Sequence, residues 1–246
     1  MNTDINKNTN NNADFENQFE TAYTLCGNEF SHDELIDMLK SGNIAQKQIA
    51  ALKFDYVGSQ TDAQVLLSNL TGCDGKIREQ VAQKINQLLL SEHAPKTYFA
   101  NTSADIFADA TIDINANICR TVIDSAALLA DYDEFSKQYI QKIVKFTNEA
   151  LNELDKFIYK DKKYLINKQL FKLYWCLEAL CCFSSQISDE ILEPILTKCA
   201  AVSEYTIREK VAYILNRINK FDNIKSSLIN DENYYVRMAF KSSTHP

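Results

Sequence analysis

The sequence predicts an all-α protein built from stacked helical hairpins, an α-solenoid. Glycine and proline are scarce, with 5 and 3 copies in 246 residues, against average usage of about 7% and 5%. Folds rich in β-structure need these residues for their turns. Amphipathic helical patterning runs from Phe15 almost to the end of the chain, and one short motif recurs within it.

Residues 1–14 differ in composition from the rest, because they are rich in asparagine and show no periodicity. Such a segment cannot bury enough apolar area to offset the entropy of ordering, so we expect a disordered tail. Residues 15–246 are predicted to form a single solenoid domain. The tail lacks the basic start and apolar run of a secretory signal. The longest nearly apolar stretch, residues 173–183, is interrupted by Glu178 and is shorter than the roughly 20 residues that span a bilayer. We therefore expect a cytoplasmic protein without membrane contact.

Several helix borders can be read in order along the chain. Ser31 is followed three residues later by Glu34, which is the spacing of a capping box. A long helix is predicted from near Glu134, with apolar side chains every three or four residues as far as Ile158. Ser188 is predicted to cap a further helix.

The recurring motif is the main evidence for a repeat. Residues 77–82 read IREQVA and residues 207–212 read IREKVA, each after a polar turn. Related segments lie at 118–122, at 235–239 and, with Lys47 in place of arginine, at 44–50. A single hairpin of about 30–40 residues cannot bury its own apolar face, so such units stack and share a core.

The spacing of the motif sets the number of repeats. Lys47 and Arg78 are 31 residues apart, Arg78 and Arg120 are 42 apart, and Arg208 and Arg237 are 29 apart. The interval of 88 residues between Arg120 and Arg208 leaves room for one further repeat. These distances predict about six hairpins.

The basic residue of the motif is predicted to be structural. Because a planar guanidinium suits multiple hydrogen bonds better than an ammonium, we expect an arginine ladder that bonds turn carbonyls or an aspartate of the next repeat. Its members are Arg78, Arg120, Arg208 and Arg237.

These features together resemble the HEAT-repeat family. The segment 190–208 is similar to one complete HEAT repeat, with Pro194 in its first helix and Ile207-Arg208 opening its second. The resemblance covers most of residues 31–240 and implies a right-handed superhelix of HEAT or armadillo type.

The same resemblance implies a non-catalytic scaffold, a monomer that binds a partner protein on a concave face lined by the second helices. Helical phase selects polar groove candidates between the core positions. They are Gln83, Asn86, Tyr213, Asn216 and Arg217.

Charge is distributed unevenly along the chain. The formal net charge is −7 overall, −6 over residues 101–136 and +5 over residues 137–172. The basic segment includes a patch of lysines among aromatic residues: Lys156, Lys160, Lys162 and Lys163. This patch could bind nucleic acid or an acidic partner, or its lysines could simply solvate an outer face. We favour solvation, because the chain is acidic overall and lysine recognises the phosphates of nucleic acid less specifically than arginine does.

No pattern in the sequence points to catalysis. The seven cysteines form no CxxC pair, the three histidines lack metal-ligand spacing, and no phosphate-binding glycine loop occurs. We therefore predict no metal, no cofactor and reduced core thiols. Some HEAT-like proteins are bilin lyases or DNA glycosylases, so an enzyme of that kind is the alternative. A nucleic-acid-binding module on residues 137–172 is another.

Overall fold

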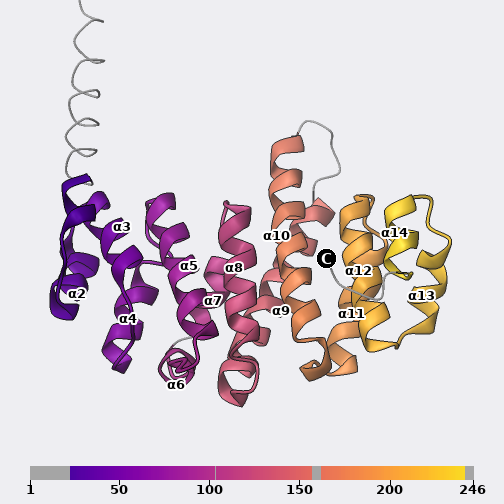
Figure 1. The fold of residues 1–246 in the computed structure, drawn as a ribbon. Helices are drawn as coiled ribbons and strands as arrows, with labels where there is room; N and C mark the ends of the chain where they lie inside the picture. The colour runs from indigo at the N-terminus through magenta and orange to yellow at the C-terminus, as the bar shows by residue number, and fades with distance from the viewer. Residues whose placement is uncertain (1–22, 103, 157–161, 242–246) are drawn as a thin grey trace, which may run out of the picture. The chain divides into compact units, whose positions relative to one another are not determined.

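The computed structural model describes residues 23–102, 104–156 and 162–241. Within these ranges all regular secondary structure is helical, and the helices follow one another as antiparallel hairpins (Figure 1). The predicted all-α solenoid class is confirmed. The predicted tail at residues 1–14 lies outside the described residues.

The chain divides into two compact units, residues 1–102 and residues 103–246. We call them unit 1 and unit 2 and describe each by itself. A single solenoid domain over residues 15–246 therefore stays a prediction.

Unit 1 contains two hairpins and a short helix. Its elements are α2 (His32–Ser41), α3 (Ile44–Lys53), α4 (Gln60–Ser68), α5 (Gly75–Leu90) and α6 (Lys96–Ala100). Helix α3 packs on α5, while α2 packs on α4 and α4 on α6, so the first and second helices form separate layers. The predicted capping box at Ser31 is present, with the Ser31 side chain on the Glu34 amide and the Glu34 carboxylate on the Ser31 amide.

One loop of unit 1 is held by a compact polar cluster. Tyr56 stacks on the His32 ring at 4.3 Å between centroids, and His32 Nε2 lies 3.2 Å from Asp62 Oδ2. The same carboxylate accepts hydrogen bonds from the amides of Gly58 and Ser59. Burial by itself would raise the pKa of Asp62, but hydrogen bonds from the Ser59 hydroxyl, the Gly58 amide and His32 together outweigh it and lower the pKa.

Unit 2 contains four hairpins. Its elements are α7 (Ala104–Thr111), α8 (Ala116–Ala127), α9 (Asp133–Lys156), α10 (Lys163–Cys182), the 3-10 turn η2 (Ser184–Gln186), α11 (Asp189–Ala200), α12 (Tyr205–Ile218), α13 (Asp222–Ile229) and α14 (Tyr234–Ala239). With the two hairpins of unit 1, the described residues form six hairpins, in agreement with the predicted number.

Two layers organise unit 2. The first helices α7, α9, α11 and α13 pack on one another in order, and so do the second helices α8, α10, α12 and α14. We call the second set the second-helix layer. Figure 1 shows α10, α12 and α14 side by side, with α10 extending beyond its neighbours at one end. Each second helix therefore contributes one face to a common surface.

The long helix α9 begins at Asp133, one residue before the predicted start. Its last described residue is Lys156, so the remainder of the predicted helix, up to Ile158, lies outside the described residues. Pro194 lies inside α11, in the first helix of its hairpin, as predicted from the repeat.

Candidate functional site

Three of the four predicted ladder arginines bind carbonyl oxygens of the turn that precedes their helix. Arg78, Arg208 and Arg237 each donate from Nη1 to the carbonyl oxygens five and six residues earlier, across the turn before their helix. Arg208 additionally donates to the Asp231 carboxylate in the turn of the next hairpin, from Nε at 2.7 Å and from Nη2 at 3.0 Å. All three arginines hold turns in place, and Arg208 also joins its hairpin to the next one.

The fourth ladder position belongs to Cys119, and the assignment of Arg120 requires correction. Arg120 is exposed, whereas the buried Cys119 donates from Sγ to the Asp113 carbonyl, six residues earlier, at 3.0 Å. Burial is the main cause that raises the pKa of the Cys119 thiol to about 12, and the nearby Asp113 carboxylate is the second. The thiol therefore keeps the proton that it donates.

The sequence contains a pattern that assigns this ladder position to Cys119. Ile118 and Val122 are four residues apart, as Ile77 and Val81 are. The residue after the first aliphatic position occupies the ladder, which makes Cys119, and not Arg120, the equivalent of Arg78.

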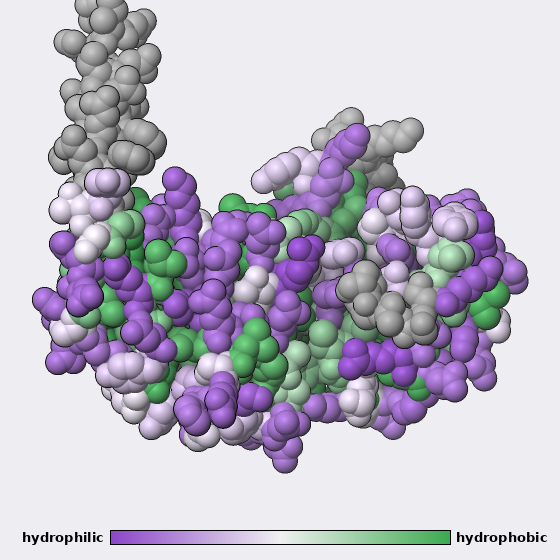
Figure 2. Space-filling model, in the orientation of Figure 1, coloured by the Kyte–Doolittle hydropathy of each residue, from purple (hydrophilic) through white to green (hydrophobic). Residues whose placement is uncertain are grey.

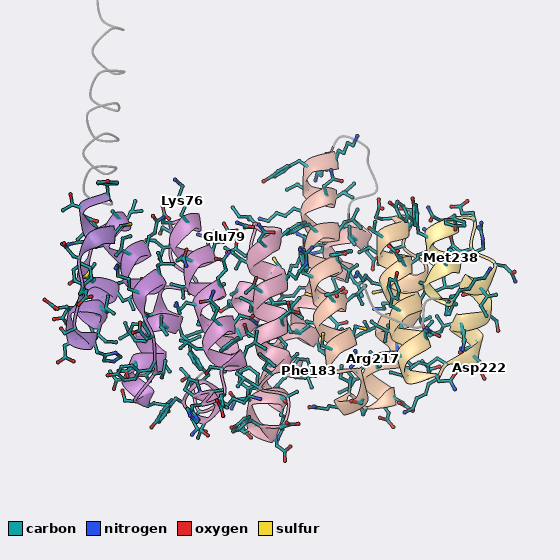
Figure 3. The ribbon with its side chains drawn as sticks, viewed as in Figure 1. Lys76, Glu79, Phe183, Arg217, Asp222 and Met238 are labelled. Atoms are coloured by element: carbon teal, nitrogen blue, oxygen red, sulfur yellow. The ribbon has the colours of Figure 1, made fainter. Side chains whose placement is uncertain are left out.

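The five predicted groove residues fall in two different units. Gln83 and Asn86 belong to α5 of unit 1, where Gln83 is exposed and Asn86 half-buried. Gln83 lines a pocket of 330 Å³ between α3 and α5, together with two further glutamines, Gln48 and Gln80. Figure 3 shows Lys76 and Glu79, which line the same pocket, towards the N-terminal end of α5.

The other three groove candidates lie on α12 of unit 2, and one of them, Tyr213, belongs to a cluster whose other members sequence reasoning missed. Lys210 is buried and forms an ion pair with Glu178 of α10. Its ammonium lies 4.8 Å from the centroid of the Tyr174 ring and 5.5 Å from that of the Tyr213 ring. We call Tyr174, Glu178, Lys210 and Tyr213 the lysine–tyrosine cluster. It fixes two half-exposed aromatic rings from adjacent helices of the second-helix layer.

The charge of Lys210 is maintained by its partner. Burial disfavours the ammonium, but the Glu178 carboxylate outweighs that effect and raises the pKa of Lys210. The sequence held two hints of this pair. Glu178 is the acid that interrupts an otherwise apolar stretch, and Lys210 replaces Gln80 between the two nearly identical motifs.

Charged side chains of neighbouring helices border the cluster. Burial, and then the negative charge of Glu178, raise the pKa of Asp124 on α8. Burial also raises the pKa of Cys182 to about 11, with the positive charge of Arg217 acting in the opposite direction. Figure 3 shows Arg217 near the C-terminal end of α12. The surface around the cluster thus draws on α8, α10 and α12.

The predicted lysine patch occupies the ends of α9 and α10. Lys156, at the end of α9, pairs with Glu153 at 2.6 Å, and both Lys162 and Lys163 are exposed at the start of α10. Lys160 lies outside the described residues. A binding role for these lysines stays a prediction.

Part of the lysine excess has a structural partner. Helix α7, from the acidic segment, packs on α9, and Lys142 lies 2.9 Å from Asp109 and 3.3 Å from Asp105. Lys172 pairs with Glu149 at 3.0 Å within the basic segment itself. The acidic and basic segments therefore neutralise one another locally when the helices stack.

A larger pocket of 680 Å³ lies between α9 and α11, on the other layer of unit 2. Its apolar walls are Ile140, Val144, Ile187 and Ile191. Across the described ranges no group of three or more His, Cys, Asp or Glu residues is placed to hold a metal ion. Among the same residues, no helix has the length and apolar character to cross a membrane.

No model of a known protein family and no curated protein matches this sequence. Among solved structures, the chain is similar to an engineered protein from the Northeast Structural Genomics Consortium, with 13% identity over 87% of this chain and 96% of that one, at a TM-score of 0.50. A designed armadillo repeat protein aligns with 11% identity over 86% of this chain and 97% of that one, at a TM-score of 0.45. The layered hairpins and the turn-binding arginines support a HEAT/armadillo-like helical-repeat fold, and the first of these similarities agrees with a fold of this kind over most of the chain.

Proposed function

We propose that this protein is a non-catalytic interaction scaffold that binds a partner protein through the second-helix layer of unit 2. The lysine–tyrosine cluster is the observation that carries the proposal. It presents two half-exposed tyrosines from adjacent helices, each in contact with one buried cation. Tyrosine is enriched among the residues that dominate binding energy at protein interfaces.

Rigidity supports this role. A side chain that is already held in place loses less conformational entropy when a partner binds. The ion pair of Lys210 with Glu178 joins α10 to α12, and its ammonium contacts both rings. Each ring offers an apolar face and a hydroxyl that can donate a hydrogen bond, so the surface suits a polar and aromatic contact.

The protonation states favour binding over chemistry. A catalytic lysine needs a lowered pKa to act as a nucleophile or base, whereas the pKa of Lys210 is raised. A reactive cysteine needs a lowered pKa. Here burial is the main cause that raises the pKa of Cys181 to about 12 and that of Cys182 to about 11.

The cellular setting that we propose is the cytoplasm, with the protein acting as a monomer. All seven cysteines fall within the described residues and all are free thiols. Proteins of oxidising compartments commonly use cysteines for disulfides, while cytosolic proteins keep them reduced.

Affinity purification from native lysate with mass spectrometry tests the scaffold. The variant Tyr213→Ala with Arg217→Glu alters the second-helix layer, and Lys137→Glu with Lys198→Glu is a matched control on α9 and α11. We expect a stoichiometric protein with wild type and control but not with the first variant. Recovery of the same protein by both variants would refute the site. Co-purification of nucleic acid or pigment with no protein partner would refute the scaffold.

A further inference from the structure

Three tyrosines form an exposed patch at the N-terminal ends of α12 and α14. Tyr205, Tyr234 and Tyr235 are 37%, 58% and 57% exposed. The Tyr205 and Tyr235 rings stack with centroids 6.1 Å apart, and the Tyr234 and Tyr235 rings meet edge-on at 5.6 Å. We call these residues the tyrosine patch. In Figure 2 the corresponding end of α12 and α14 is pale, between the hydrophilic and hydrophobic extremes.

The patch is not required to pack the core. Ile207, Val236 and Ala239 fill that role on the same two helices and are fully buried. Large aromatic side chains that remain exposed together are typical of interaction surfaces.

The backbone beneath the patch is firmly held. The Asn233 side chain accepts a hydrogen bond from the Tyr235 amide at 2.9 Å, and Asp231 accepts one from the Asn233 amide at 2.8 Å. Asp231 is in turn bound by Arg208 of α12. The rings of α12 and α14 are therefore presented from one connected support.

Acidic residues border the tyrosine patch. Glu204 caps α12 immediately before Tyr205, and the exposed Glu232 lies in the turn just before α14. The nearby cations Arg208 and Arg237 donate to turn carbonyls, and Arg208 also pairs with Asp231 and, at 3.6 Å from its Nη2, with Glu232. Acidic residues outnumber arginines at this rim by three (Glu204, Asp231 and Glu232) to two, so a complementary ligand carries a positive charge.

The size of the patch restricts the kind of partner. Three partly exposed tyrosine rings offer about 300 Å² in total, since a whole aromatic side chain buries about 150–250 Å². A folded partner needs about 800 Å² on each side. A short segment that is already ordered before binding can bind through a much smaller surface, because it loses less conformational entropy.

We propose that the tyrosine patch binds a proline-rich segment in the polyproline II conformation that carries a basic residue. Proline rings pack between aromatic ridges, and the polyproline II backbone leaves its carbonyls free to accept hydrogen bonds from phenol hydroxyls. The basic residue pairs with Glu204 or Glu232. This inference rests on the proposed function, because the patch continues the second-helix layer and supplies the chemistry of the partner.

Fluorescence anisotropy with the purified full chain tests the proposal. The probe is a labelled peptide of eight prolines flanked by arginines, and the control peptide replaces each proline by glycine or serine with the arginines kept. We expect the control peptide to bind at least tenfold more weakly. Equal binding of both peptides, or no binding of either, would overturn the proposal without any protein variant.

Variants locate the site. Tyr234→Ser with Tyr235→Ser is expected to weaken binding of the proline peptide about tenfold, and Glu232→Gln to reduce its dependence on salt. Tyr164→Ser is the matched control, since Tyr164 is 78% exposed on α10. An equal loss with this control would overturn the assignment. If the lysate partner depends on Tyr213 and Arg217 while the peptide does not bind, the scaffold stands and this inference fails.

Discussion

Arg208 on α12 and Asp231 in the turn before α14 form a buried, two-pronged ion pair, with Nε–Oδ2 at 2.7 Å and Nη2–Oδ1 at 3.0 Å. The same guanidinium also closes its own turn through the carbonyls of Val202 and Ser203. One side chain thus satisfies a turn within its hairpin and connects that hairpin to the next.

Replacing Arg208 by lysine should therefore destabilise the protein. An ammonium cannot reproduce the planar fork, and breaking a buried ion pair by removing one partner costs about 3–5 kcal/mol. We expect Arg208→Lys to lower the free energy of unfolding, measured by urea denaturation, by about 2 kcal/mol or more. This loss is smaller than for complete removal of the partner because lysine retains the positive charge. Arg217→Lys, at an exposed position on the same helix, should change stability by less than about 0.5 kcal/mol.

The pH dependence of the free energy of unfolding should reveal the contribution of the Asp231 carboxylate. Hydrogen bonding from Arg208 lowers the pKa of Asp231 below its ordinary value of 3.8. The folded state then binds this proton less readily than the unfolded state. Its contribution is fully present above pH 3.8 and is lost as pH falls through the lower, folded pKa.

Urea denaturation between pH 7 and pH 2.5 measures this contribution. Asp231→Asn should flatten the acid side of the stability curve relative to wild type. An unchanged slope in the variant would contradict the linkage. Asp62, whose pKa is also lowered, remains in both proteins and accounts for part of the residual slope.

The exchange of roles between Cys119 and Arg120 can be tested directly. Cys119→Ala removes a buried donor to the Asp113 carbonyl and leaves a small cavity, so we expect a loss of about 1–2 kcal/mol. Arg120→Ala should cost less than about 0.5 kcal/mol, because the side chain is exposed. Thermal melts of the two variants decide the assignment, and a larger effect at Arg120 would reverse it.

The lysine–tyrosine cluster predicts strong coupling between Lys210 and Glu178. Lys210→Met leaves the Glu178 carboxylate without its cation in a half-buried position, and we expect a loss of about 3 kcal/mol. The double variant with Glu178→Leu should recover most of that loss, because both charges are then absent. Additive effects of Lys210→Met and Glu178→Leu in a double-mutant cycle would show that the two side chains act independently.

The sequence by itself determined the helical repeat. Scarce glycine and proline, the capping box at Ser31 and the motif shared by residues 77–82 and 207–212 are local signals, readable because a helix places positions three and four apart on one face. The same motif also contained the register that assigns the ladder position to Cys119.

Tertiary structure decided which side chains meet across hairpins. Lys210 and Glu178, like Lys142 and Asp109, are about thirty residues apart along the chain, and no helical period relates them. Their contact depends on how far each hairpin shifts and rotates against its neighbour, which the packing of both helix layers sets together. For that reason the ladder could be anticipated from a repeated residue, whereas the cluster that forms the candidate site could not.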